Sequence, residues 1–310
     1  MCTDGEEYAE QAIRFGGRFA RGLDANVTVL HVRPRAMAAE PNRLTTDLKN
    51  LTEWNREIPA IAYLARAGEI LAEMGLARSL PAGLTEVRHV FRKTAEGGVE
   101  LHLVGHGAER VRLKLREGEA ADEILSEAHH GGYDLIITGS RGHKGSARYF
   151  VGSTALRVAE FAPCSVLIAK NIKEQHHFLM CTDGSKLAER AELFGATIAQ
   201  ALGARVMVLS VSPDEADRAQ AQERVRRAEM VLNQLGIQAQ VKVRVGRPSE
   251  EIIQEAKDHD IVVMGASGSS AVRRFFLGSV PLKVIEYGQC PVLLVREKPA
   301  SPRSRRAKSR

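Results

Sequence analysis

Two glycine-rich segments with identical spacing are the part of this sequence best suited to hold an anion. The shared pattern is Gly-x2-Gly-x9-Gly-Ser, found at Gly139, Gly142, Gly152, Ser153 and Thr154 and again at Gly265, Gly268, Gly278, Ser279 and Val280. Each copy follows an apolar run, residues 134–138 or 260–264, that predicts a buried strand leading into a loop and a helix. Glycines let a backbone approach an anion closely, and free amides at a helix N-terminus attract negative charge. Two copies in the same setting therefore predict phosphate binding more strongly than one.

A second repeated motif, Met-Cys-Thr-Asp-Gly, supplies one carboxylate to each half of the chain. It contains Asp4 and Asp183, 179 residues apart, and the same offset carries the apolar run 27–32 onto 206–211. The glycine-rich segments repeat at an offset of 126 residues, so 53 additional residues lie in the first half between its second strand and its loop. The chain is therefore an internal duplication with one insertion.

These repeats divide the chain into a first domain at residues 1–172, a second domain at 173–298 and a basic tail at 299–310 that we expect to be disordered. The insertion spans about residues 40–108. It carries helical spacing over 43–75 and then a predicted β-hairpin formed by 85–93 and 99–104. Its role stays open between a flap over the first site, an interface element and mere decoration.

Strands that alternate with helices predict the fold of each half. Continuous apolar strands indicate a parallel sheet covered on both faces, and right-handed crossovers favour a doubly wound, Rossmann-like topology with five strands per domain. The first strand of the first domain, residues 1–3, is short. In such sheets ligands bind at the carboxyl ends of the strands, so each Asp-Gly and its glycine-rich segment should meet at one crevice.

Composition excludes several classes of function. The net charge is +6, but the last ten residues carry five Arg or Lys and no acid, so the remainder has a net charge of only +1. We therefore expect no nucleic-acid partner for the folded part. No run of 18 apolar residues predicts a membrane span, no secretory leader is visible, and Cys2, Cys164, Cys181 and Cys290 have apolar neighbours. We expect core cysteines in a cytoplasmic protein that does not bind the membrane.

The repeated motifs resemble those of the universal stress protein family, over nearly the whole chain as two tandem domains. Both spacers also share an Arg-aromatic-Phe segment, at Arg148 and Arg274. The resemblance implies the nucleotide α-hydrolase type of fold and an ATP site in each crevice. It implies that the phosphates and ribose contact Gly139, Gly142, Gly152, Ser153 and Thr154, with Arg141 as an additional phosphate partner, while Asp4 and the backbone at Val32 face ribose and adenine. The matching set is Asp183, Val211, Gly265, Gly268, Gly278, Ser279 and Val280.

By this resemblance the protein is a cytoplasmic regulatory or stress-response module that binds ATP, ADP or AMP, with or without Mg²⁺. No catalytic residue or metal-ligating cluster stands out, and slow ATP hydrolysis stays open. The alternatives are an ATP-using enzyme of the nucleotide α-hydrolase superfamily and a structural pseudo-dimer without a ligand. In a purely structural interpretation, the glycines only form tight turns, and Asp4 and Asp183 only cap helices.

The resemblance also predicts that the two domains pair through their last strands, residues 165–168 and 291–295, around a pseudo-two-fold axis, and it leaves a homodimer open. The two crevices are not equal, because the second loop has serines where the first has Arg141, His143 and Lys144. If only one crevice binds a nucleotide, we expect it to be the first.

Overall fold

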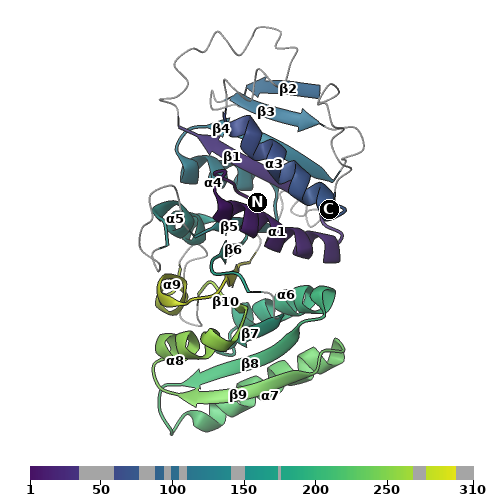
Figure 1. Cartoon of the computed structure of the whole chain (residues 1–310). Helices are drawn as coiled ribbons and strands as arrows, with labels where there is room; N and C mark the ends of the chain where they lie inside the picture. Colours follow the sequence, from purple (N-terminus) through teal and green to yellow (C-terminus); the bar gives the residue numbers. More distant parts are fainter. Residues whose placement is uncertain are drawn as a thin grey trace, which may run out of the picture.

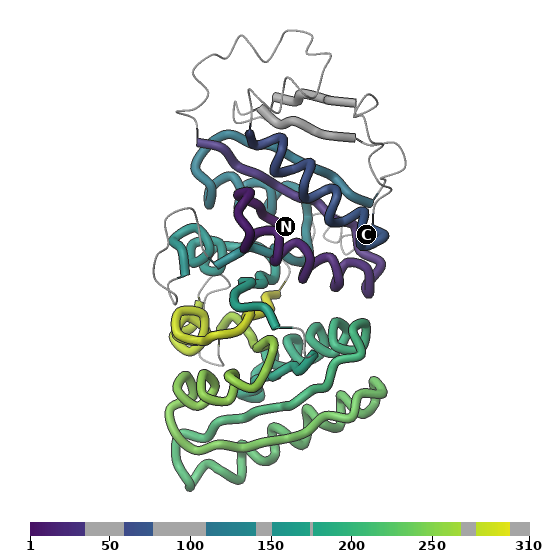
Figure 2. Tube along the Cα trace, in the orientation of Figure 1, coloured from purple at the N-terminus to yellow at the C-terminus, as the bar shows by residue number. Residues whose placement is uncertain are grey.

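A computed structural model describes residues 1–34, 59–76, 88–93, 99–104, 110–140, 151–173, 176–267 and 277–297 of the chain. Figure 1 shows the described elements stacked in one long body, with β2 at one end and β9 at the other. The colour along the trace in Figure 2 shows that the two ends of this body come from the first and second halves of the sequence.

The first domain alternates helices and strands as expected, with a hairpin in addition. In chain order its elements are α1 (Glu7–Gly22), β1 (Val27–Arg33), α3 (Pro59–Glu73), β2 (Arg88–Lys93), β3 (Val99–Val104), β4 (Val111–Glu117), α4 (Ala120–Gly131), β5 (Leu135–Gly139), α5 (Ser153–Phe161) and β6 (Ser165–Ala169).

The second domain repeats the pattern without the hairpin. Its elements are β7 (His177–Cys181), α6 (Lys186–Leu202), β8 (Arg205–Ser212), α7 (Arg218–Gln234), β9 (Ala239–Val245), α8 (Pro248–Glu255), a 3₁₀ turn (Ala256–Asp258), β10 (Ile261–Gly265), α9 (Ser279–Tyr287) and β11 (Val292–Val295).

Local sequence signals explain where the helices of the second domain begin and end. Ser185 caps α6 by accepting a hydrogen bond from the Ala188 amide at 3.2 Å, and Gly203 ends this helix in the left-handed conformation, which glycine adopts readily. Helix α7 begins at Arg218, after a turn in which the Asp214 carboxylate accepts a hydrogen bond from the Asp217 amide at 3.0 Å.

The strands of the two domains are joined edge to edge, partly through residues 1–3, into one continuous ribbon of sheet. The second domain has the strand order β9-β8-β7-β10-β11, all parallel, which is the doubly wound topology that the sequence predicts. In the first domain, residues 1–3 take the place of β7: the Thr3 amide donates to Leu30 O at 3.0 Å and the Cys2 amide donates to Ile137 O at 2.8 Å. The short first strand therefore lies between β1 and β5.

The segment between β1 and β4 contains one helix that has a counterpart in the second domain and one hairpin that does not. Helix α3 packs against α1, β1 and β4, as α7 packs against α6, β8 and β9, so it is the ordinary crossover helix and not an addition to the fold. The predicted hairpin is confirmed: β2 and β3 pair antiparallel, and β3 pairs antiparallel with β4. The hairpin thus covers a sheet edge whose counterpart in the second domain, β9, has a strand on one side only among the described residues.

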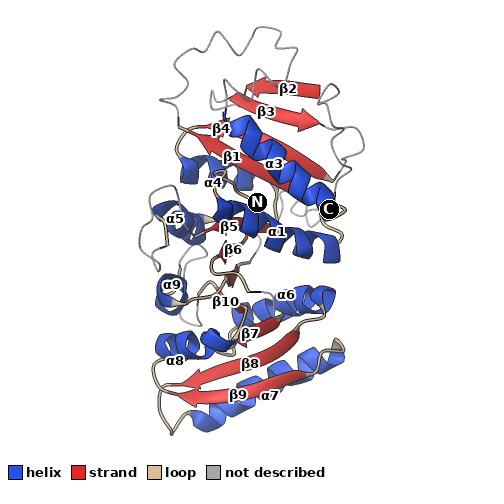
Figure 3. Cartoon of the chain, in the orientation of Figure 1, coloured by secondary structure: helices blue, strands red, loops and turns tan. Residues whose placement is uncertain are grey.

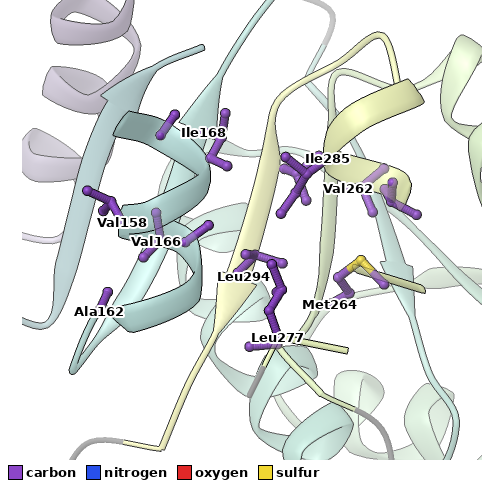
Figure 4. Packing of buried hydrophobic residues seen from close by; sticks show 14 of the residues in the cluster. Val158, Ala162, Val166, Ile168, Val262, Met264, Leu277, Ile285 and Leu294 are labelled. Carbon is purple, nitrogen blue, oxygen red and sulfur yellow. The ribbon is translucent and has the colours of Figure 1, made fainter. Parts of the chain in front are cut away.

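Helices cover both faces of the ribbon (Figure 3). Helices α1, α3, α6 and α7 pack on one face, and α4, α5, α8 and α9 pack on the other. The apolar cores run through the junction between the domains. Figure 4 shows Val158, Val166 and Ile168 of the first domain packed beside Ile285 and Leu294 of the second.

The domains join where β6 pairs antiparallel with β11, with Leu167 opposite Leu293, as predicted for the last strands. Two buried cations, at equivalent positions after these strands, reach across the junction. Lys170 Nζ donates to Ile285 O near the end of α9, and an Arg296 guanidinium nitrogen donates to Ala159 O near the end of α5. Each cation therefore contacts the C-terminal end of a helix in the other domain, where the helix dipole favours positive charge.

Burial lowers the pKa of Lys170 to about 8, and this predicts a pH dependence of stability. An unfolded lysine has a higher pKa, so between these values the unfolded chain binds more protons, and the free energy of unfolding rises with pH. We expect the stability of the wild type relative to Lys170→Met to increase by about 2 kcal/mol from pH 7 to pH 10. Urea denaturation at several pH values measures this difference, and a difference that stays constant with pH would contradict it.

Candidate functional site

A cavity of about 190 Å³ lies at the carboxyl ends of the first-domain strands. It is where the sequence analysis places the first crevice. The predicted residues among its lining are Asp4, Val32, Gly139, Gly152, Ser153 and Thr154. The lining residues that were not predicted for the site are Cys2, Thr3, Ala9, Leu30, Ala120, Ile124, Thr138, Ser140 and Ala155.

The Asp4 side of the cavity is a tight turn held by side chains. Thr3 Oγ1 accepts a hydrogen bond from the Gly5 amide at 3.2 Å, and Asp4 Oδ1 accepts one from the Glu6 amide at 3.1 Å. The N-cap of α1 is Glu6, so Asp4 holds the turn that precedes the helix and does not itself occupy the cap position. The second domain repeats this geometry, with Asp183 Oδ1 accepting from the Ser185 amide at 3.0 Å.

Two aromatic rings support this turn, and the sequence analysis did not single out either of them. His31 Nδ1 lies 2.8 Å from Thr3 O, and the His31 ring packs edge-on against Tyr63 of α3 with ring centroids 5.3 Å apart. Gly5 has φ +85°, and a β-carbon at this position would overlap the Tyr63 ring. Since α3 comes from a segment without a recognisable repeat partner, only the packing of the folded chain brings Tyr63 to Asp4.

The opposite side of the cavity is the N-terminus of α5. Gly152 is its N-cap and has no side chain to occupy the first-turn amides. The Gly152 amide donates to Ser140 O at 2.8 Å, and the Ser140 amide donates to Ala169 O at 3.0 Å. These bonds bring the ends of the glycine-rich segment together, next to the last strand. Arg141 and Gly142 lie outside the described residues.

The second domain links the ends of its glycine-rich segment in the same way. The Gly278 amide donates to Ala266 O at 2.9 Å, the Ala266 amide donates to Val295 O at 3.0 Å, and Gly278 is the N-cap of α9. Gly265 ends β10, Ser279 and Val280 begin α9, Val211 lies near the end of β8, and Asp183 is exposed. Gly268 lies outside the described residues.

The two crevices differ in polarity at equivalent positions. Thr138, Ser140 and Thr154 line the first cavity, and the repeat places Met264, Ala266 and Val280 at these positions in the second domain. The second domain also has a buried carboxylate, Glu192, where the first has Ile13. Burial raises the pKa of Glu192 to about 6, and a hydrogen bond to Thr182 opposes this rise. The first crevice is therefore the better suited to a polyanion.

Cys2 distinguishes the first cavity chemically. All four cysteines are free thiols; Cys164, Cys181 and Cys290 are buried, whereas Cys2 is partly exposed and lines the cavity. The prediction of core cysteines thus holds for three of them. Burial raises the pKa of the Cys2 thiol, while the nearby N-terminal ammonium group lowers it. The rate at which a thiol in this position is alkylated therefore depends on whether a ligand occupies the cavity.

The described residues also bear on other classes of site. Among them, no group of three or more His, Cys, Asp or Glu side chains is arranged to hold a metal ion. The same part of the chain contains no helix with the length and apolar character needed to cross a bilayer.

Comparison with known proteins agrees with the duplication. The model of the universal stress protein family matches residues 1–170 and again residues 175–296. A universal stress protein of Synechocystis sp. is 26% identical over 307 residues, which cover 96% of this chain and 98% of the relative. A universal stress protein of Bacillus subtilis is 40% identical over 170 residues, covering 55% of this chain and 96% of the relative.

Solved structures show the same architecture. The crystal structure of a universal stress protein from Archaeoglobus fulgidus matches 95% of this chain with a TM-score of 0.63 and 19% sequence identity, and 96% of that chain is covered. This likeness establishes the tandem fold and assigns no ligand.

The contact between Gly5 and Tyr63 predicts unequal costs for two otherwise similar substitutions. Gly5 and Gly75 both have positive φ, +85° and +76°, but a β-carbon at Gly75 meets no atom of the described residues within 4 Å. We expect Gly75→Ala to cost about 1 kcal/mol through backbone strain alone, and Gly5→Ala at least about 1 kcal/mol more through overlap with Tyr63. Denaturation measures both, and Tyr63→Ala should reduce the additional cost. Equal costs would show that Tyr63 does not restrain the turn.

Proposed function

The chain belongs to the universal stress protein family, with two family domains in tandem, and from this premise we propose that it is an adenine-nucleotide-binding regulatory protein. The ligand that we propose is ATP, with ADP and AMP as weaker alternatives, bound in the cavity of the first domain. The observation that carries this proposal is the cavity itself. Six residues that the motifs and the family resemblance indicate for one site line a single cavity at the carboxyl ends of the strands.

The phosphates fit the glycine-rich side of this cavity. The amides of the first turn of α5 have no side-chain cap at Gly152, and the positive end of the helix dipole lies there. The hydroxyl groups of Ser153 and Thr154 offer further donors at the same place. In this proposal Gly142 and Arg141 would add contacts from the glycine-rich segment.

The nucleoside fits the Asp4 side. Asp4 would accept hydrogen bonds from the ribose hydroxyls, and Leu30 and Val32 provide apolar contacts for the adenine ring. Asp4 is the only carboxylate among the described lining residues, so a bound Mg²⁺ would be held chiefly by the phosphate oxygens. Metal and nucleotide are therefore expected to bind together.

We propose that the second crevice, if it binds a nucleotide, does so more weakly. The hydroxyls of the first cavity are replaced there by Met264, Ala266 and Val280. Lost hydrogen-bond donors are not compensated by apolar groups of similar size. The regulatory role and a location in the cytoplasm belong to the same proposal.

Titration with ATP and Mg²⁺ tests the ligand, and the Cys2 thiol identifies the site. We expect isothermal titration to show binding with one tighter site per chain. Saturating ATP should slow alkylation of Cys2, since the nucleotide covers it, and Cys2→Ser should abolish the labelling of the native protein. Absence of heat and of protection would exclude the proposed function. Heat without Cys2 protection would place the nucleotide elsewhere.

Gly139→Val distinguishes an effect on ligand binding from an effect on folding. Among the described residues, a β-carbon at Gly139 meets no atom within 4 Å, and this glycine borders the cavity. The larger side chain should therefore leave the melting temperature nearly unchanged while it weakens ATP binding by at least about tenfold through overlap with the ligand. Gly265→Val is the equivalent change in the second domain, and there the new side chain would contact Leu187 of the protein itself. Unchanged ATP affinity in Gly139→Val would contradict the placement of the nucleotide.

A further inference from the structure

Helix α5 joins the first cavity to the second domain. It has nine residues, so its two ends lie only about 13 Å apart. Its N-terminal residues Ser153 and Thr154 line the cavity, and two carbonyls at its C-terminal end accept hydrogen bonds from a side chain of the second domain. A group that holds the C-terminal end of such a short helix also determines where its N-terminal amides lie.

That group is Arg296, which follows the last strand of the second domain. One guanidinium nitrogen donates to Ala159 O and to Glu160 O, the latter at 2.9 Å. The Arg296 amide donates to Ser165 Oγ at 3.3 Å, which fixes the backbone against β6. The side chain is only 8% exposed, so these carbonyls are satisfied by a buried cation in place of water.

We propose that Arg296 is a positioning residue for the nucleotide site of the first domain, so that the second domain completes a site whose described lining comes from the first domain. This inference rests on the proposed function. The guanidinium group acts on the ligand through α5 in two ways. It fixes the orientation of the helix, and it places a positive charge at the negative end of the helix dipole.

The charged groups around Arg296 are consistent with this role. Burial lowers the pKa of Arg296, whereas Glu160 and Cys164 act in the opposite direction. An arginine stays protonated even when its pKa falls, so the contact persists across the physiological pH range. The positioning effect is therefore expected not to depend on pH.

The duplication supplies an internal control at the same burial. Lys170 occupies the equivalent position after β6, is also 8% exposed, and donates to Ile285 O in α9. Helix α9 belongs to the second domain, and its residues are absent from the described lining of the first cavity. Loss of either cation should disturb the junction, but only loss of Arg296 should disturb α5.

The experiment measures protection of Cys2 from alkylation against ATP concentration in the full chain. We expect Arg296→Met to weaken the ATP affinity at the first cavity by about three- to tenfold, the range of a charge at a helix terminus. Lys170→Met should leave this affinity within about twofold of the wild type, and Arg296→Lys should restore most of it. Thermal melts of all variants show whether the junction is destabilised equally.

The outcomes separate this inference from the proposed function. If the wild type shows no ATP protection of Cys2, the proposed function fails at the first cavity. If the wild type is protected but Arg296→Met and Lys170→Met weaken ATP equally or not at all, the positioning role is wrong and nucleotide binding stands. Should Arg296→Met not fold, Arg296→Gln, which keeps a donor and removes the charge, takes its place with the same expectation.

Discussion

Strands β6 and β11 pair antiparallel through Val166, Leu167 and Ile168 opposite Leu294, Leu293 and Val292, and all six side chains are buried. This pairing turns two sheets into one ribbon and lets their apolar cores merge on both faces. Each domain would otherwise present an unpaired edge strand with an apolar surface beside it, which favours association with other chains. The junction therefore protects both domains, and it also brings the end of each one against a helix of the other.

A second constraint, repeated in each domain, is an ion pair that joins β4 to α4 and β9 to α8. Lys114 Nζ lies 2.7 Å from a Glu127 oxygen, and its counterpart Lys242 lies 2.8 Å from Glu255. Both glutamates are buried, and each has a second cation nearby, Arg116 at 3.9 Å from Glu127 and Arg244 at 2.9 Å from Glu255. Removing a glutamate would leave both of its cations without their counter-charge, which is far more destabilising than never having the cluster. The duplication has thus retained a costly but mutually dependent arrangement.

The same duplication has diverged at the ligand crevices. The backbone geometry is shared: in both domains the helix N-cap glycine and the last strand are linked through the residue after the fourth strand, Ser140 or Ala266. The side chains differ, because hydroxyls of the first crevice give way to apolar groups in the second. A common scaffold with unequal lining suits one principal nucleotide site and a second domain that supports it.

Repetition is what made the fold and much of the site readable from the sequence alone. The glycine spacing and the Asp-Gly motif, each present twice, identified Asp4, Gly139 and Gly152, and these do line one cavity. Local patterns also predicted the hairpin and the strands of the junction, because period and turn chemistry are properties of short segments.

Only the tertiary structure decided which distant side chains support the site. Tyr63 against Gly5, the partial exposure of Cys2 and the contact of Arg296 with α5 carry no local signal. They arise from packing between segments that are far apart in the chain, and α3 could be recognised as the crossover helix only by its neighbours. The physical reason is that spacing encodes what a residue's own segment does, whereas burial and contact depend on what the rest of the chain places beside it.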